Sequence, residues 1–123
     1  MPATRDFSGT FAVLKGLLVP YASRLHAAQD SATFYMLDGE YVADFKRPMP
    51  FGGVQIRRAF VSFHLSPIYS HPELLGNVSD ALKKRLHGRS CFNFVRPERE
   101  LLVELSALVD AGFGLYERLG WVK

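Results

Sequence analysis

Helical and strand-like patterns divide this chain into three parts, and their order constrains the fold more than any other feature. Apolar residues recur at steps of three and four over residues 8–28, and a leucine-rich stripe does the same over residues 98–118. Between these stretches, β-branched and aromatic residues are concentrated in four short segments, residues 32–37, 51–56, 59–65 and 90–94. Strands grouped between helices predict an α+β fold, with an antiparallel sheet and N- and C-terminal helices packed mainly on one face.

Glycine and proline mark the expected connections. Pro20 predicts either a bend in the first helix or the start of a second one. Asp38-Gly39 predicts a tight turn with a short return strand over residues 41–43. The two prolines between Lys46 and Pro50 predict irregular chain. Arg57-Arg58 suits a two-residue turn poorly, so we expect a longer loop with both arginines at its tip.

A second helical signal lies between the last two strand-like segments. Residues 66–78 are expected to form a loop with one helical turn after Pro72. Ser79 is a suitable N-cap for a short helix over residues 80–86, and Gly88 is placed to stop it.

Size and composition indicate one globular domain spanning residues 1–123, since 48% of the residues are apolar and 22% are charged. A net charge of +3 permits anionic partners but does not by itself indicate a nucleic-acid partner, for which a dense basic stripe is expected. The single cysteine, Cys91, rules out an internal disulfide and fits the reducing cytoplasm. The N-terminal residues carry no apolar signal core, and no apolar run is long enough to span a bilayer. These features predict a cytoplasmic protein with no membrane partner.

The alternation of side chains along the strands predicts one apolar and one polar face of the sheet. Val61, Phe63 and Leu65 form an apolar set that suits contact with the helices. The opposite, mixed set consists of Gln55, Ser62, His64, Cys91 and Asn93, with Tyr35 or Met36 beside them. Such a face is either the solvated side of an antiparallel sheet or a surface for a small ligand.

No pattern of residues predicts a catalytic site, a metal site or a cofactor. The histidines are His26, His64, His71 and His87, and no pair has the spacing of a helical zinc site. Cys91 has histidines within reach, but a single cysteine in a strand is more often a small buried apolar residue. Phosphate-binding glycine loops and paired catalytic carboxylates are absent from the sequence.

A basic cluster is the strongest charge feature of the sequence. It consists of Lys83, Lys84, Arg85, His87 and Arg89. These cations would complement the dipole at the C-terminus of the helix expected over residues 80–86. They also supply candidate contacts to an anionic ligand.

Two stretches of the sequence resemble those of a known family. The first is Phe60-Val-Ser-Phe-His-Leu-Ser-Pro-Ile-Tyr69, and the second is Ala81-Leu-Lys-Lys-Arg-Leu-His-Gly-Arg-Ser-Cys-Phe-Asn-Phe94, which a leucine-rich last helix follows. Together they resemble the YdhG-like family of small bacterial proteins. The similarity covers residues 50–115 and implies an α/β sandwich with an antiparallel sheet. One branch of that family is frataxin-like and acts as an iron chaperone. Here residues 8–28 contain no Asp or Glu, which departs from the acidic surface that an iron role requires.

Three hypotheses of function follow. The first is a non-enzymatic module that binds a small ligand, with anionic ligands included, on the open face of the sheet. Its candidate ligand-binding residues are Tyr35, Gln55, Ser62, His64, Tyr69, Lys84 and Arg89. The second is a metal chaperone that uses Asp38, Glu40, Asp44 and His64. The third is a homodimeric interaction subunit, in which an exposed tail from Tyr116 to Lys123 carries Trp121 to a neighbouring molecule.

Overall fold

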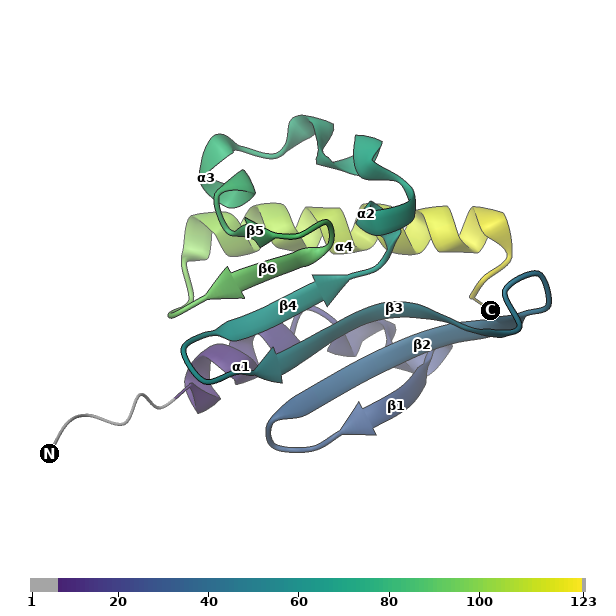
Figure 1. Cartoon of the computed structure of the whole chain (residues 1–123), viewed down its shortest axis with the longest axis horizontal. Helices are drawn as coiled ribbons and strands as arrows, with labels where there is room; N and C mark the ends of the chain where they lie inside the picture. The colour runs from purple at the N-terminus through teal and green to yellow at the C-terminus, as the bar shows by residue number, and fades with distance from the viewer. Residues whose placement is uncertain (1–6, 123) are drawn as a thin grey trace, which may run out of the picture.

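The computed structural model describes residues 7–122 and contains a single six-stranded antiparallel sheet. The strand order is β1-β2-β3-β4-β6-β5. The strands are β1 (His26–Asp30), β2 (Phe34–Val42), β3 (Arg47–Ile56), β4 (Val61–Leu65), β5 (Leu86–His87) and β6 (Cys91–Phe94). Figure 1 shows α1 (Ser8–Lys15) and α4 (Arg99–Leu119) behind the sheet, which confirms the predicted α+β class. Residues 1–6 and Lys123 lie outside the described residues. The expectation of no export signal depends partly on residues 1–6.

The N-terminal helical stretch is shorter than its sequence pattern predicts. Helix α1 ends at Lys15, and the 3-10 helix η1 (Val19–Arg24) then begins with Pro20 in its first turn. Of the two alternatives at Pro20, the structure therefore has the second helix. Residues 26–30 form the edge strand β1 instead of helix. All five of its residues are exposed, so the strand has none of the alternation by which a half-buried strand is recognised.

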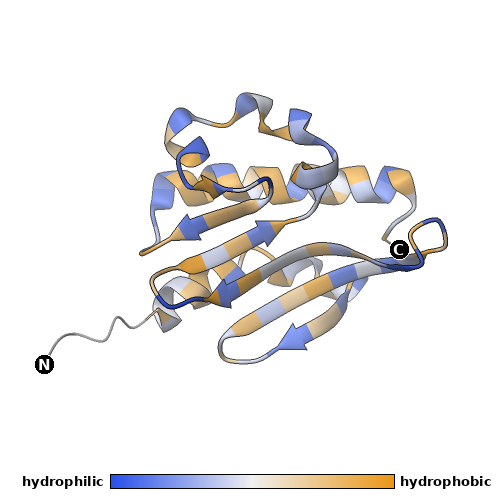
Figure 2. Ribbon diagram, viewed as in Figure 1, coloured by the Kyte–Doolittle hydropathy of each residue, from blue (hydrophilic) through white to orange (hydrophobic). Residues whose placement is uncertain are grey.

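The core lies between the sheet and helices α1 and α4. Tyr35, Val54, Phe63 and Phe92 pair with one another across neighbouring strands and are buried on the helix side. Figure 2 shows hydrophobic and hydrophilic residues alternating along the strands, as expected for a sheet with one covered face. An aromatic cluster joins α4 to β3: Phe51 meets the rings of Phe113 and Tyr116 at centroid distances of 5.8 and 5.5 Å.

The predicted turn at Asp38-Gly39 and the return strand over residues 41–43 are wrong. Asp38, Gly39 and residues 41–42 belong to β2, and the chain reverses only at residues 43–46, where Lys46 has a positive φ of 57°. Gly39 serves a different purpose, because the C-terminal tail crosses β2 at this point. The Glu40 amide donates to the Trp121 carbonyl at 2.7 Å, and a Cβ atom on Gly39 would collide with that same carbonyl oxygen.

The irregular segment predicted from Pro48 and Pro50 is also wrong, because both prolines lie within β3. They are tolerated for a positional reason. Strand β4 pairs with β3 only from Gly52 onward, so the first part of β3 has a strand on one side alone. A residue without an N–H group can occupy a strand where no neighbour needs its hydrogen bond.

The segment between β4 and β6 contains more helix than expected before Ser79 and less after it. Its helices are α2 (Pro67–Ser70), η2 (Pro72–Asn77) and α3 (Asp80–Lys83). Ser79 is confirmed as the N-cap, since its Oγ accepts from the Leu82 amide at 3.2 Å. Gly88 does not stop this helix; its φ of 70° forms the turn between β5 and β6. The loop at Arg57-Arg58 is confirmed, with Arg57 donating from its amide to the Phe60 carbonyl.

The tail that was expected to reach a neighbouring molecule folds back instead. Tyr116 is buried within α4, and Val122 is buried after the helix has ended at a left-handed Gly120. The half-buried Trp121 ring packs edge-on against Tyr116 and Phe45. These side chains belong to the fold and leave no free aromatic tail among the described residues.

We predict that Gly39→Ala destabilises the protein by about 2 kcal/mol, the usual scale for overpacking against atoms that cannot move freely. The added methyl group meets the backbone of the tail, and the Glu40–Trp121 hydrogen bond must lengthen. The change is measured as a shift in the urea midpoint. Gly76→Ala is the matched control, because a Cβ atom there has no neighbour within 4 Å. Equal midpoints for the two variants would contradict the role assigned to Gly39.

Candidate functional site

The strand register places a row of four residues across the open face. Met36 pairs with Gly53, Gly53 with His64, and His64 with Cys91. A second row runs through Phe34, Gln55, Ser62 and Asn93. The predicted common face of Gln55, Ser62, His64, Cys91 and Asn93 is therefore confirmed.

Tyr35 does not belong to this face, which corrects its inclusion among the candidate ligand residues. It pairs with Val54 on the helix side and is only 4% exposed. The Lys15 ammonium of α1 lies 4.6 Å from its ring centroid and covers it. Met36 takes the place beside His64 instead. A shift of one residue in a strand exchanges the two faces, and here it decides between Tyr35 and Met36.

A pocket lies at the edge of the sheet where β3 continues beyond β4, and we call it the notch. Its volume is about 350 Å³. It is lined by Arg47, Met49, Pro50, His64, Ser66, Tyr69, Ser70, Ser90 and Tyr116. The missing strand neighbour of Arg47–Pro50 makes room for it, and the first residues after β4 close its other side.

His64 is the central polar group of the notch, with hydrogen-bond partners at both ring nitrogens. Its Nε2 lies 2.9 Å from Ser66 Oγ, and its Nδ1 lies 3.1 Å from Ser90 Oγ. Both serines are buried, at 8% and 7% exposure. Cys91 Sγ also lies within 3.4 Å of Nδ1. These contacts hold the imidazole in one orientation.

Burial lowers the pKa of the His64 imidazole from its ordinary value of 6.5. The cause is desolvation, because the charged ring loses more hydration than the neutral ring when it is covered by protein. His64 is therefore a neutral hydrogen-bonding group at neutral pH, and one of its nitrogens can accept a proton.

The notch is lined by one permanent cation, Arg47, and by no carboxylate, and a second cation, Arg89, lies near its mouth. Arg47 lies at one side, and the Arg89 guanidinium lies 5.9 Å from the ring centroid of Tyr69. Tyr69 is 59% exposed, so its ring is available at the mouth of the notch. The Tyr116 hydroxyl donates to the Pro50 carbonyl at 2.8 Å, and burial raises its pKa strongly. The hydroxyl is thus neutral, and the electrostatics of the notch favour an anion.

A smaller hollow of about 220 Å³ lies on the open face beside the notch, and we call it the sheet hollow. It is lined by Phe34, Met36, Gly53, Val54, Gln55, Arg57, Ser62, His64 and Cys91. Met36 lies directly over Gly53, because a Cβ atom there would meet its sulfur at 2.5 Å. The predicted residues Gln55, Ser62 and His64 come together here, whereas Tyr69 reaches only the notch. His64 lines both spaces.

Lys84 lies apart from these two spaces. It is exposed directly after α3, where it shares a shallow depression with Arg85 and Glu98. Arg85 forms an ion pair with Glu98, so this cation of the basic cluster is partly neutralised. Of the two predicted charge contacts, only Arg89 lies near the His64 site.

The residues proposed for a metal chaperone do not form a common site. Asp38 and Glu40 line a pocket with His26, which lies 2.9 Å from the Glu40 carboxylate. His64 lines the notch and the sheet hollow instead, and Asp44 lies in the turn after β2. Within residues 7–122, no group of three or more His, Cys, Asp or Glu side chains is arranged to hold a metal ion.

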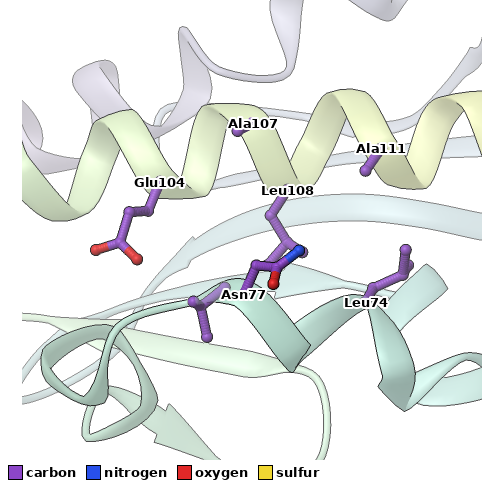
Figure 3. Close-up of a pocket in the computed structure, with 7 residues that line it drawn as sticks. Leu74, Asn77, Glu104, Ala107, Leu108 and Ala111 are labelled. Atoms are coloured by element: carbon purple, nitrogen blue, oxygen red, sulfur yellow. The ribbon is translucent and has the colours of Figure 1, made fainter.

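Another depression lies between η2 and α4 (Figure 3) and is lined mainly by alkyl side chains. Leu74, Val78, Ala107, Leu108 and Ala111 supply its apolar surface. Its polar Glu104 already binds the amide and hydroxyl of Ser79. This groove therefore offers little polar chemistry, unlike the notch.

Comparisons with protein-family models, with curated proteins and with solved structures find no match to this chain. Each helix among residues 7–122 falls short of the combined length and apolar character that a bilayer crossing requires. The functional assignment therefore depends on the residues around His64.

Sequence analysis missed Arg47, Ser66, Ser90 and Tyr116 as residues of the site. One signal was present for Ser66, because the alternation of Ser62 and His64 continues to it. Arg47 was hidden in a proline-rich segment that suggested no strand. Tyr116 reaches the notch from the far end of α4, and no local pattern connects it with Pro50.

The lowered pKa of His64 makes stability depend on pH. Below about pH 6.5 the unfolded chain takes up a proton at this ring before the folded protein does, so protonation favours unfolding. We expect the free energy of unfolding of the wild type to fall relative to that of His64→Gln as the pH drops from about 7.5 to about 5. Urea unfolding across this range measures the difference. Parallel pH curves for the two proteins would show that His64 titrates normally.

Proposed function

We propose that this protein binds a small molecule with an acidic group and a compact apolar body, and that the notch is its binding site. The supporting observation is a pocket in which His64 orders two buried hydroxyls beside an arginine, with no carboxylate among the lining residues. The protein acts as a binding module in this proposal. Its single cysteine suits a reducing compartment such as the cytoplasm.

The apolar part of the ligand is matched by the walls of the notch. Met49 and Pro50 come from β3, and the rings of Tyr69 and Tyr116 come from α2 and α4. At about 350 Å³ the space is at the lower end of the volumes usual for small-molecule sites, so it suits a ligand about as large as one substituted ring.

The acidic part of the ligand is matched by Arg47 and the hydroxyl groups. A guanidinium can donate two parallel hydrogen bonds to a carboxylate or a phosphate. Arg47 lies at the wall of the notch and near Asp38, whose pKa burial raises and the charge of Arg47 partly restores. A bound anion would share this arginine with Asp38.

Thermal stability tests the preference for an anion. We expect benzoate and phenyl phosphate to raise the melting temperature, whereas benzamide and benzylamine have no such effect at equal concentration. Binding to the folded state alone stabilises it by about 2.7 kcal/mol at a ligand concentration one hundred times Kd. Equal shifts for benzoate and benzylamine would overturn the proposed ligand class.

A matched pair of arginine variants tests the location. Arg47→Gln should abolish the shift that benzoate produces, because it removes the cation from the notch. Arg96→Gln should retain it, since Arg96 is exposed beyond the opposite end of β6. Loss of the shift in both variants would indicate a nonspecific charge effect instead of a site at the notch.

A further inference from the structure

Cys91 differs from an ordinary half-buried cysteine because a base and a residue that orients the base are in place beside it. Its Sγ lies 3.4 Å from Nδ1 of His64, the residue opposite it on β4. The other ring nitrogen, Nε2, lies 2.9 Å from the buried Ser66 hydroxyl. A nucleophile within hydrogen-bond reach of a base, whose other ring nitrogen is held by an orienting group, is the arrangement that activates a thiol.

The hydrogen bonds are consistent with the tautomer that this role requires. If Nε2 carries the proton and donates to Ser66 Oγ, then Nδ1 is free to accept a proton from Cys91. Because burial keeps the ring neutral, the acceptor is not already protonated at neutral pH. Ser90 competes for Nδ1, since its hydroxyl lies closer, at 3.1 Å.

Space and charge around the thiol indicate what can approach it. Cys91 is half-buried and lines the sheet hollow together with Arg57. Gly53 contributes no side chain to this surface, and no Asp or Glu is among the lining residues. A reagent that carries carboxylates therefore meets a cation and no anion in this hollow.

We propose that Cys91 is a nucleophilic thiol, with His64 as its base, and that it forms a mixed disulfide with small disulfides that carry carboxylates. The Cys91 proton moves to His64 Nδ1, and the thiolate sulfur attacks one sulfur of the small disulfide. A bond forms between these two sulfurs while the original disulfide bond breaks. The departing thiolate takes the proton back from His64, so one thiol is oxidised and one half of the disulfide is reduced to a thiol. This reaction does not require a ligand in the notch.

The test follows the intact mass of the folded protein during incubation with oxidised glutathione or with cystamine. We expect His64→Gln to slow the reaction with oxidised glutathione by roughly tenfold or more, since a positioned base commonly contributes on the order of a hundredfold. Ser66→Ala should also slow it, because the orienting hydrogen bond is lost. Ser90→Ala should accelerate it, because the competing hydroxyl is removed. Opposite responses of the two serine variants distinguish this chemistry from a general loss of packing.

Charge selectivity is the second part of the test. For Cys91, we compare the rate of reaction with oxidised glutathione to the rate of reaction with cystamine. The ratio of these two rates should exceed the same ratio measured for the free thiol N-acetylcysteine. Arg57→Gln should lower the protein's ratio, and Arg96→Gln should leave it unchanged. The melting temperature of each variant serves as a control for folding. As a second control, the reaction rates are measured in denaturant, where Cys91 should react alike in all variants. The proposal is overturned if His64→Gln reacts as fast as the wild type, if Ser90→Ala is slower, or if the ratio equals that of N-acetylcysteine.

Discussion

Strand β3 is longer than the segment of it that β4 pairs with, and the candidate site depends on this difference. Pairing with β4 begins at Gly52, so the backbone from Arg47 to Pro50 has a strand neighbour only in β2. An unpaired strand segment must have its polar groups satisfied in some other way. Here two positions are prolines, which have no N–H group, and the Pro50 carbonyl accepts from Tyr116. The space that a longer β4 would occupy remains as the notch.

Helix α4 and the tail after it complete this arrangement from the opposite side of the sheet. Tyr116 packs against Phe51 through its ring and contributes its hydroxyl to the floor of the notch. Gly120 then reverses the chain, and the Trp121 carbonyl binds the Glu40 amide on β2. The same few residues therefore anchor the C-terminus and form part of the site. A change that loosens the tail should alter the shape of the notch as well as the stability of the fold.

His64 connects the two spaces on which the proposals depend. Its ring lines the notch, where Ser66 and Ser90 lie within hydrogen-bond distance of it. It also lines the sheet hollow, where Cys91 is half-buried. Since a single imidazole supplies hydrogen bonds to both, a group attached to Cys91 would change the surroundings of a ligand in the notch. Binding and thiol chemistry would then be coupled through one side chain.

The class of fold and the polar face of the sheet follow from the sequence alone, because both depend on local periodicity. Alternation along residues 59–65 places Ser62 and His64 on one side of their strand, and alternation along residues 90–94 does the same for Cys91 and Asn93. Tertiary structure decided the rest. The backbone of a distant tail gives Gly39 its role, and the length of a neighbouring strand makes the prolines of β3 acceptable. Arg47 and Tyr116 meet His64 only because segments far apart in the chain end at the same edge of the sheet. Local sequence patterns carry no information about contacts of this kind, because the contacts depend on the strand register and the helix lengths of the whole fold.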